Sequence, residues 1–492
     1  MCRTPMSKTE PATHASVPNR VLGGIPLIVD LDGALVRSDL LIESFFAAVS
    51  TDYRRIPALL WALIRGKAAF KASIADCATV NATHLPYDSD VLRMVDEARS
   101  ERRPVYLASA SNKLYVSTIA AHLGSFQGWF ASDNDRNLLS TAKAQLLVQE
   151  FGEGNFDYIG NDQADLAVWR AARCRIAVHP SRSVKRNLLA IDPAAVVVEP
   201  PAGRLKAWVK LIRCHQWAKN GLIFVPVLTA QRFDLISIGQ AILAFFAFCL
   251  AASSIYILND LIDLDADRRH PTKKLRPLAA GTVPIFEAMI VSPLLMLAAL
   301  ALAFAVSLWF SAVLVFYAVL STAYSFALKR KLIVDIIVLA TLYTIRVIGG
   351  AAAISVLVSE WLLGFSMFIF TALALIKRYV ELTALRERNL PDPTRRNYRK
   401  TDVEIVGALA AASGFNAVTI FCLYISSDTV RSMYSRPILL WLICPILMYW
   451  LGRALVMAHR KVMEDDPLVF ALKDRNSRVA FGMILAILFA AA

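Results

Sequence analysis

The chain has 492 residues, 57% of them apolar, and a net charge of +14. This apolar share is too high for a wholly soluble protein and indicates a membrane protein. The positive charge gathers in loops between apolar runs, which argues against nucleic acid as a partner. The seven cysteines are scattered without a C-x-x-C pair or Cys/His spacing, which argues against a zinc site.

The N-terminal part of the chain predicts a soluble α/β domain over residues 23–199. Residues 1–22 have no apolar core, so we expect a disordered tail and not a signal peptide. Three apolar runs predict buried parallel strands, at Ile25–Asp32, Pro104–Leu107 and Phe156–Ile159. Ligands bind at the carboxyl edge of such sheets. The polar residues that end or follow these runs include Asp30, Asp32, Ser109, Asn161, Asp162 and Asp165. We expect a mostly helical insert over residues 40–98, a helix beginning near Lys143, and a last short strand before the break at Pro200.

These motifs, in this order, resemble the haloacid-dehalogenase (HAD) phosphatase superfamily over about residues 25–195. The resemblance implies a Rossmann-like domain with a helical cap. It implies that Asp30 is the nucleophile that forms an aspartyl-phosphate, and that Asp32 is the general acid and base. By the same resemblance Ser109 and Lys143 hold the phosphate, and Mg²⁺ is bound by Asp30, Asp162 and Asp165.

The sequence departs from the family pattern at two positions. Ala34 stands where the family usually has Thr, and Asn161 stands where the first late acid is expected, with Asp162 displaced by one residue. An active phosphatase and a domain that only senses a phosphorylated ligand therefore both remain open.

The remaining part, residues 200–492, predicts an all-α membrane domain of about nine helices. Each apolar run is near the length that crosses a bilayer, and the runs lie at 208–229, 237–258, 284–305, 308–328, 333–353, 361–381, 405–425, 437–457 and 477–492. Loops after even-numbered runs carry 18 Lys and Arg residues, against 3 in loops after odd-numbered runs. The positive-inside rule then predicts a multi-pass protein of the bacterial inner membrane, with the N-terminal domain cytoplasmic and the C-terminus outside.

The segment Asn259–Asp267, N-D-L-I-D-L-D-A-D, follows the second apolar run. Asn259, Asp263 and Asp267 are spaced four apart, so a helix places them on one face with Asp260 beside them. Carboxylates held this close repel one another unless a cation lies between them. Hard oxygen ligands suit Mg²⁺, which usually also binds substrate phosphates. The segment therefore predicts a Mg²⁺–diphosphate site at a membrane surface, with Asp260, Asp263 and Asp267 as ligands.

The N-D-x-x-D-x-x-x-D motif resembles the first signature of the UbiA superfamily of intramembrane prenyltransferases. The second acidic motif of that superfamily is reduced here to Asp335, since position 339 is Leu. Further residues resemble the decaprenyl-phosphate phosphoribosyltransferase branch, and the implied substrate-binding residues are Asn259, Lys273, Lys274, Arg276, Tyr324, Lys329, Asp335, Arg346, Lys377 and Arg378.

The resemblance implies transfer of 5-phosphoribose from phosphoribosyl pyrophosphate to a polyprenyl phosphate, with Mg²⁺ and with Asp263 and Asp267 as catalytic residues. The fused domain would remove the 5-phosphate and so lead towards arabinose donors of the cell envelope. The main alternative is transfer of a prenyl group to an aromatic acceptor, and a transporter is a more distant one. The sequence leaves the oligomeric state open, with a homo-oligomer as one option.

Overall fold

The computed structural model describes residues 24–66, 70, 73–74, 81–132, 138–200, 203–387, 392, 396–428, 430, 434–463 and 467–491. The expected tail over 1–22, three of the counted loop arginines (Arg388, Arg395 and Arg431) and the terminal Ala492 lie outside these residues. The chain forms two compact units. The first holds the described residues up to Ile212 together with Ile257–Val291, and the second holds Arg213–Tyr256 and the described residues from Ser292 onward.

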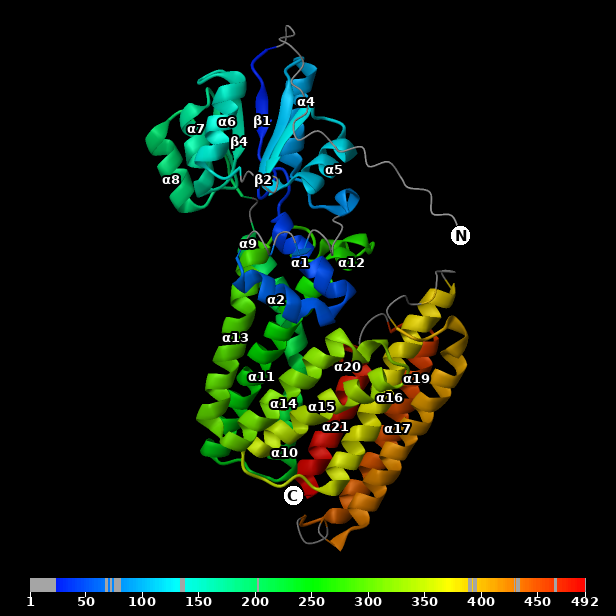
Figure 1. The fold of residues 1–492 in the computed structure, drawn as a ribbon. Coiled ribbons are helices and arrows are strands. Elements are labelled where there is room, and N and C mark those ends of the chain that lie inside the picture. The colour runs from blue at the N-terminus through cyan, green and yellow to red at the C-terminus, as the bar shows by residue number, and fades with distance from the viewer. Residues whose placement is uncertain are drawn as a thin grey trace. The chain divides into compact units, whose positions relative to one another are not determined.

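The first unit is built on a six-stranded sheet in the order β3-β2-β1-β4-β5-β6 (Figure 1). All its strand pairs are parallel, which confirms the predicted α/β class. The strands are β1 (Leu27–Val29), β2 (Val105–Asn112), β3 (Gly128–Ser132), β4 (Asp157–Gly160), β5 (Arg175–Val178) and β6 (Val196–Val198). The predicted strands correspond to β1, β2, β4 and β6, whereas β3 and β5 were not anticipated.

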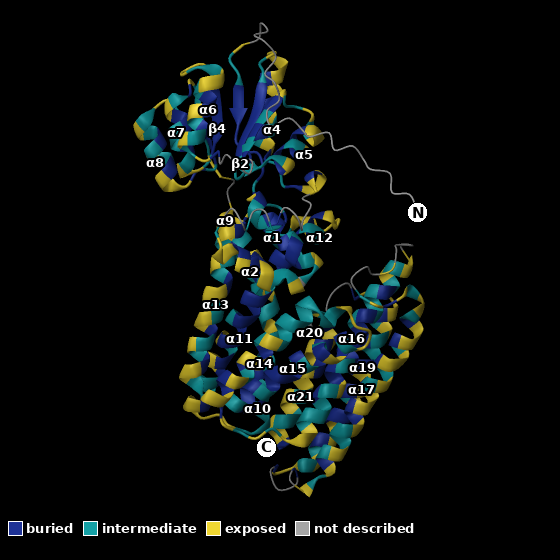
Figure 2. Cartoon of the chain, viewed as in Figure 1, coloured by how far each residue is buried: buried dark blue, intermediate teal, exposed yellow. Residues whose placement is uncertain are grey.

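Helices cover both faces of this sheet, and successive residues of β1 face opposite ways because side chains alternate along a strand. Leu27 and Val29 join one apolar core, and Ile28 joins the other with Trp169. Figure 2 shows the sheet as buried. The helices of this unit are α1 (Leu40–Thr51), α2 (Ile56–Ile64), α4 (Ser89–Ser100), α5 (Lys113–Leu123), α6 (Thr141–Phe151), α7 (Leu166–Ala171), α8 (Arg182–Ile191), α9 (Arg204–Ile212) and α12 (Leu264–Arg269).

The insert between β1 and β2 is mainly helical, as expected. It contains α1, α2, the short 3₁₀ helix η2 (Ala82–His84) and α4. Asp39 caps α1 and Asp88 caps α4, each accepting hydrogen bonds from backbone N–H groups of the first turn.

Seven helices in the described part of the chain are long and apolar enough to cross a membrane. They are α11 (Leu235–Ile262), α13 (Ile285–Val306), α14 (Leu308–Phe326), α15 (Val334–Ala353), α16 (Glu360–Glu387), the segment Lys400–Ser426 that contains α17 (Val403–Ser426), and the segment Pro437–His459 that contains α19 (Ile443–His459). These correspond to the second to eighth apolar runs of the sequence.

The first and last predicted spans differ from the others. The run at 208–229 is not one helix but falls into α9, the 3₁₀ helix η4 (Cys214–Phe224) and α10 (Val225–Thr229). Arg213 between the first two pieces has φ 58°, in the left-handed region that interrupts an α-helix. The last run forms α20 (Pro467–Lys473) and α21 (Arg475–Ala491), of which α21 has 17 residues.

Candidate functional sites

The carboxyl edge of the sheet brings Asp30, Lys143 and Asp165 together. The Lys143 ammonium donates to Asp30 Oδ1 at 2.9 Å and to Asp165 Oδ1 at 3.3 Å. It also donates to the Tyr158 hydroxyl at 2.9 Å, and that hydroxyl donates to Asp165 Oδ1 at 2.7 Å. Asp30 directly follows β1, Lys143 lies in the first turn of α6, and Tyr158 lies within β4. Three elements thus place one ammonium between two buried carboxylates.

Asp32 lies beside this cluster with both carboxylate oxygens occupied. Oδ2 accepts from the hydroxyls of Ser111 at 2.6 Å and Ser109 at 3.1 Å, and Oδ1 accepts from the backbone N–H of Leu40 at 2.9 Å. Ser109 and Ser111 are two residues apart near the end of β2, so they lie on the same side of the strand. The structure therefore joins the predicted Ser109 to Asp32 and adds Ser111.

Burial shifts the acidity of these groups. It raises the pKa of Asp30 to about 7, although the Lys143 charge acts in the opposite direction. Burial also raises the pKa of Asp32, assisted by the charge of Asp39. Burial alone would lower the pKa of Lys143, but Asp30 and Asp165 raise it above its ordinary value. A carboxyl that holds its proton more strongly is suited to donating that proton to a leaving alcohol.

Asn161 and Asp162 occupy different places at the end of β4. Asn161 lies over Gly33, where an added Cβ would come within 2.2 Å of the amide nitrogen; Gly33 has φ +79°. The Asn161 Oδ1 is buried and has no hydrogen-bond partner. Asp162 is exposed, and its carboxylate caps the short 3₁₀ helix η3 (Gln163–Asp165). An orphaned buried oxygen fits a metal ligand better than an exposed cap does, so the geometry favours Asn161 over the predicted Asp162.

The predicted metal ligand Asp165 has a structural role in this state. Its Oδ2 accepts from the backbone N–H groups of Asn161 at 2.9 Å and Asp162 at 3.1 Å. Its Oδ1 accepts from Tyr158 and Lys143. Asp165 therefore shapes the loop that carries Asn161.

The acidic segment Asn259–Asp267 continues the end of α11 into α12. The Asp263 N–H donates to the Asn259 carbonyl at 2.9 Å, and the Asp267 N–H donates to the Asp263 carbonyl at 2.8 Å. These bonds keep Asn259, Asp263 and Asp267 in one helical row, as their spacing predicts. Asp260 and Asp267 are buried.

Arg276 supplies the cation that this group of carboxylates requires. Its guanidinium donates to Asp267 Oδ2 at 2.6 Å and to Asp260 Oδ1 at 3.1 Å. Burial nevertheless raises the pKa of Asp267 above its ordinary value. A group of hard oxygen donors that gathers around one positive charge has the chemistry to hold Mg²⁺, with Asp260, Asp263 and Asp267 as the residues that would bind it.

The neighbouring basic residues lie at the surface of the same loop. Lys273 and Lys274 form the exposed 3₁₀ helix η5 (Lys273–Leu275). Asp265 turns away from the predicted row and pairs with Arg269 at 2.7 Å. The loop thus offers two exposed ammonium groups for an anionic substrate.

In the second unit, Asp335 is fully buried and already paired. Its Oδ2 accepts from Arg378 at 2.6 Å and its Oδ1 accepts from the Tyr398 hydroxyl at 2.7 Å. Arg378 also donates to Glu381 and lies over the Tyr398 ring, 5.0 Å from its centroid. Its Nε is buried without a hydrogen-bond partner. The predicted residues Tyr324, Lys329 and Lys377 are half-buried in this unit.

Arg346 is held by groups other than carboxylates. Its Nε donates to Asn220 Oδ1 at 2.8 Å, and its other nitrogens donate to the Tyr317 hydroxyl at 3.1 Å and to the Leu342 carbonyl. The guanidinium also lies over the Tyr317 ring, 4.9 Å from its centroid. These contacts tie α15 to η4 and α14, and they give the predicted substrate-binding Arg346 a packing role.

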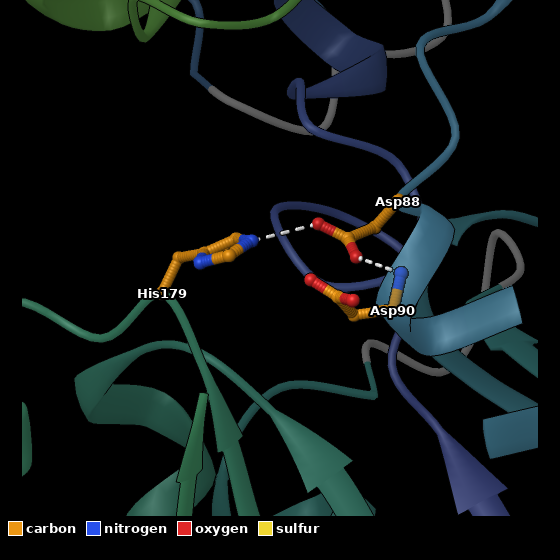
Figure 3. A group of neighbouring side chains, drawn as sticks. All are labelled: Asp88, Asp90 and His179. Carbon is orange, nitrogen blue, oxygen red and sulfur yellow. Dashed lines mark hydrogen bonds and ion pairs between the residues drawn. The ribbon is translucent and has the colours of Figure 1, made fainter. Parts of the chain in front are cut away.

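A cluster that the sequence did not suggest contains Asp88, Asp90 and His179 (Figure 3). His179 Nε2 lies 2.8 Å from Asp88 Oδ2, and Arg37 Nε donates to the same oxygen at 2.7 Å. Asp88 Oδ1 caps α4. These contacts satisfy the buried carboxylate, so the cluster joins α4 to the end of β5 and needs no ion to do so.

Sequence reasoning also missed Tyr158, Ser111 and Tyr398. The sequence could have identified Tyr158 and Ser111 as candidate site residues, since each is a polar group near the carboxyl end of a predicted strand. Tyr398 had none, because it reaches Asp335 from a loop 63 residues further along the chain.

Comparison with known proteins places the membrane part in a class of transferases. Residues 222–477 match the UbiA prenyltransferase family. The chain therefore belongs to the UbiA prenyltransferase family. The described N-terminal part of the chain forms the six-stranded parallel α/β sheet.

Three relatives are similar in sequence to this chain. The uncharacterized protein y4nM of Sinorhizobium fredii is 33% identical over 456 residues, which cover 92% of this chain and 88% of the relative. The nodulation protein NoeC of Azorhizobium caulinodans is 36% identical, covering 56% of this chain and 91% of its own length. The decaprenyl-phosphate phosphoribosyltransferase of Mycobacterium tuberculosis is 37% identical, covering 44% of this chain and 74% of its own.

Solved structures resemble each part separately. A UbiA homologue from Archaeoglobus fulgidus bound to GPP and Mg²⁺ covers 58% of this chain and 99% of its own, with 15% identity and a TM-score of 0.46. A phospho-aspartyl intermediate analogue of phosphoserine phosphatase covers 36% of this chain and 94% of its own, with 15% identity and a TM-score of 0.26.

Proposed function

We propose that the membrane domain transfers 5-phosphoribose from phosphoribosyl pyrophosphate to a polyprenyl phosphate. The observation that carries this proposal is the Arg276 guanidinium held by Asp260 and Asp267. One loop thus combines a cluster of carboxylates with a guanidinium, as binding of a metal-complexed diphosphate requires. The named phosphoribosyltransferase relative, 37% identical, supports the same donor.

The acidic residues would bind the donor's diphosphate as its Mg²⁺ complex. The bound ion supplies positive charge that stabilises the departing diphosphate. Asp260, Asp263 and Asp267 would fix the position of that complex, and Asn259 would act as a further oxygen donor or orient the row. Asp263 and Asp267 are the two acids of the row that we assign to catalysis.

The basic residues of this loop would neutralise the remaining phosphate charge. Arg276 would leave its carboxylates for a phosphate oxygen, because a guanidinium forms paired hydrogen bonds to phosphate as well as to carboxylate. The exposed Lys273 and Lys274 would bind the 5-phosphate. Cleavage at ribose C1 leaves an electron-poor carbon, which a phosphate oxygen of the polyprenyl phosphate attacks without a strong general base.

Residues of the second unit would serve the acceptor. Arg378 carries a buried Nε without a partner, and Lys329, Lys377 and Tyr324 are the further donors that the family resemblance implies. Charged groups within apolar helices are costly and are retained mainly for function. We assign Asp335 to positioning Arg378.

The alternative, transfer of a prenyl group from its diphosphate, relies on a second acidic motif. Only Asp335 remains of that motif, and Arg378 and Tyr398 occupy both its oxygens. This pairing favours the phosphoribosyl donor over a prenyl diphosphate held by two acidic groups. The family name and the lipid ligand of the solved homologue keep the alternative open to test.

The soluble domain would then remove the 5-phosphate from the lipid product. Asp30 is placed for attack on phosphorus, Asp32 for proton transfer, and Lys143 for neutralising the phosphate. The site keeps a half-buried amide, Asn161, where the family usually has an acid. We therefore expect a slow phosphatase with a high Mg²⁺ requirement, acting on the inner side of a bacterial membrane as a step towards arabinose donors.

In the direct test, purified protein is incubated with Mg²⁺, phosphoribosyl pyrophosphate and polyprenyl phosphate. The mass of the lipid product is then measured by mass spectrometry. Wild type should add a phosphopentose or, after dephosphorylation, a pentose. Asp263→Ala should lose transfer, whereas Asp265→Ala, which removes the neighbouring carboxylate paired with Arg269, should keep it. Prenylation of an aromatic acid with no pentose-containing lipid would transfer the assignment to the alternative.

A further inference from the structure

Helix α2 in the insert of the soluble domain exposes an apolar face. Trp61 is 64% exposed and Ile64 is 77% exposed, while Leu59 and Ala62 face inward. Pro57, Trp61 and Ile64 are spaced four and three apart, so they share one face of the helix. This is the reverse of a water-facing helix, which places polar residues outward. Figure 2 shows exposed residues along α2.

Arginines flank this face. Between Tyr53 and Gly66 the chain carries Arg54, Arg55 and Arg65 and no acidic residue. Arg54 and Arg65 are exposed. Arginines that flank an outward row of Trp and Ile are typical of helices that lie in the interface of an anionic membrane.

Helix α2 is linked through α1 to α12, which follows a helix long and apolar enough to cross a membrane. Glu43 of α1 accepts hydrogen bonds from both terminal nitrogens of Arg268, at 2.7 and 2.5 Å, and both side chains are buried. Arg268 lies in α12, which follows the end of the membrane-spanning helix α11 after one residue. Only Asp52 and the short 3₁₀ helix η1 (Tyr53–Arg55) separate α1 from α2. The insert is therefore attached to the segment that leaves the bilayer.

We propose that α2 is a membrane-surface anchor: its Trp61–Ile64 face inserts among the headgroups and acyl chains of anionic phospholipid, and Arg54 and Arg65 bind the headgroup phosphates. The partner is a lipid surface and not a second protein. The positive charge of the three arginines is complementary to anionic lipid. The same chain also carries the helices that would cross the bilayer, so a lipid surface is always close by.

The anchor has a consequence for substrate choice. The insert that carries α2 begins at Leu40, whose N–H binds the Asp32 carboxylate. A phosphatase site whose cap lies on lipid is placed to receive a phosphate ester whose tail stays in the bilayer. This part of the inference rests on the proposed phosphatase function, whereas the anchoring does not.

Photocrosslinking tests the anchor directly. Benzoylphenylalanine is placed at Ile64 in the full chain, reconstituted in nanodiscs that contain anionic phospholipid. The matched control carries it at Glu97, an exposed residue of α4. We expect a phospholipid adduct from position 64 at several times the yield from position 97. Arg54→Gln with Arg65→Gln should lower the yield at 64, and Arg186→Gln on α8 should not.

Three outcomes would overturn the proposal: equal lipid yields at the two positions, an adduct at 64 that is mainly a second copy of the chain, or a yield indifferent to both arginines. A second measurement avoids the bulky label. Trp61 fluorescence, obtained as wild type minus Trp61→Phe, should be quenched by brominated phospholipid, and its absence counts against the anchor. If the protein forms lipid adducts at position 64 but shows no phosphatase activity, only the inference about a lipid-linked phosphate ester would fail.

Discussion

The contacts of Arg276 show that the acidic segment needs a positive charge to neutralise its carboxylates. Two buried carboxylates within reach of each other are unfavourable unless a cation neutralises them. In the structure that cation is Arg276, which donates to Asp260 and Asp267. Sequence spacing predicted the clustering of acids, and the family resemblance implied that Arg276 binds substrate. It did not predict that the arginine pairs with the acids, because the two segments are joined by a loop whose path no periodicity determines.

Removing Arg276 should separate its two roles. In Arg276→Ala, Mn²⁺ used in place of Mg²⁺ should bind more tightly without donor, since a competing charge worth roughly 1 kcal/mol, or about fivefold in affinity, is gone. Transfer from phosphoribosyl pyrophosphate should fall at the same time. Electron paramagnetic resonance of bound Mn²⁺ measures the first effect. Arg269→Ala, which frees only Asp265, is the control, and weaker Mn²⁺ binding in Arg276→Ala would contradict the competition.

Asn161 and Asp162 give a second residue-level prediction. Asn161→Ala should raise the Mg²⁺ concentration needed for half-maximal phosphate release, because the buried Oδ1 is lost. Asp162→Ala should change this requirement little, since its carboxylate caps η3 at the surface. Titration of phosphate release with Mg²⁺ distinguishes the two. A larger effect at Asp162 would restore the ligand that the sequence alone suggested.

At the scale of elements, patterns of buried strands and apolar helices carried most of the prediction. The strands β1, β2 and β4 were found because each ends in polar residues at one sheet edge. The strand β3 (Gly128–Ser132) was missed because it begins with Gly, which is depleted in strands, and contains only three apolar residues. The first span was predicted as continuous because hydropathy averages over its length, whereas one left-handed residue, Arg213, divides it.

The bridge between α1 and α12 should support the acidic segment. Glu43→Gln leaves the buried Arg268 charge without its counter-ion, a change that typically costs about 3–5 kcal/mol. We expect faster hydrogen exchange in α12 and a higher KM for phosphoribosyl pyrophosphate. Hydrogen exchange with mass spectrometry and steady-state kinetics measure both. Glu97→Gln on the exposed face of α4 should change neither, and an unaltered α12 in Glu43→Gln would show that the bridge is dispensable.

The contacts of Asp88 predict acid sensitivity where α4 begins. Burial alone would raise the pKa of Asp88, but hydrogen bonds from His179 and Arg37 hold it well below its usual range. An acid with a lowered folded-state pKa adds stability that is complete above its unfolded pKa of about 4 and is lost as pH falls further. Its other charged neighbour, Asp90, has the same sign and adds no counter-ion.

Hydrogen exchange of α4, corrected for intrinsic rates, should therefore quicken as pH falls below about 4. Asp88→Asn keeps a helix-capping side chain but loses the ion pairs. It should exchange faster at neutral pH and respond less to acid. Asp96→Asn, on the exposed side of α4, should behave as wild type does. An acid response retained in Asp88→Asn would assign the effect to another group.

At the scale of the whole molecule, one chain joins a membrane domain of the UbiA prenyltransferase family and an α/β domain for which we propose phosphatase activity. The motifs that define each were readable because each follows one helix or ends one strand. The relation between the two activities was inferred from chemistry alone: the proposed product of the first carries a phosphate ester that the second would remove. Joining two sites raises the effective concentration of that intermediate at the second site.

The last prediction tests this relation. Asp30→Asn removes the proposed nucleophile, so transfer should continue while the 5-phosphorylated lipid accumulates. Wild type should release the dephosphorylated lipid at high Mg²⁺. Mass spectrometry of the lipid extract follows both species. When Asp30→Asn and Asp263→Ala are held in separate nanodiscs and mixed, dephosphorylation should stay low, because a polyprenyl lipid does not leave its bilayer; in shared vesicles it should recover. If wild type releases only the phosphorylated lipid at high Mg²⁺, the domain is no phosphatase for this product, and a sensor of phosphorylated ligand takes its place.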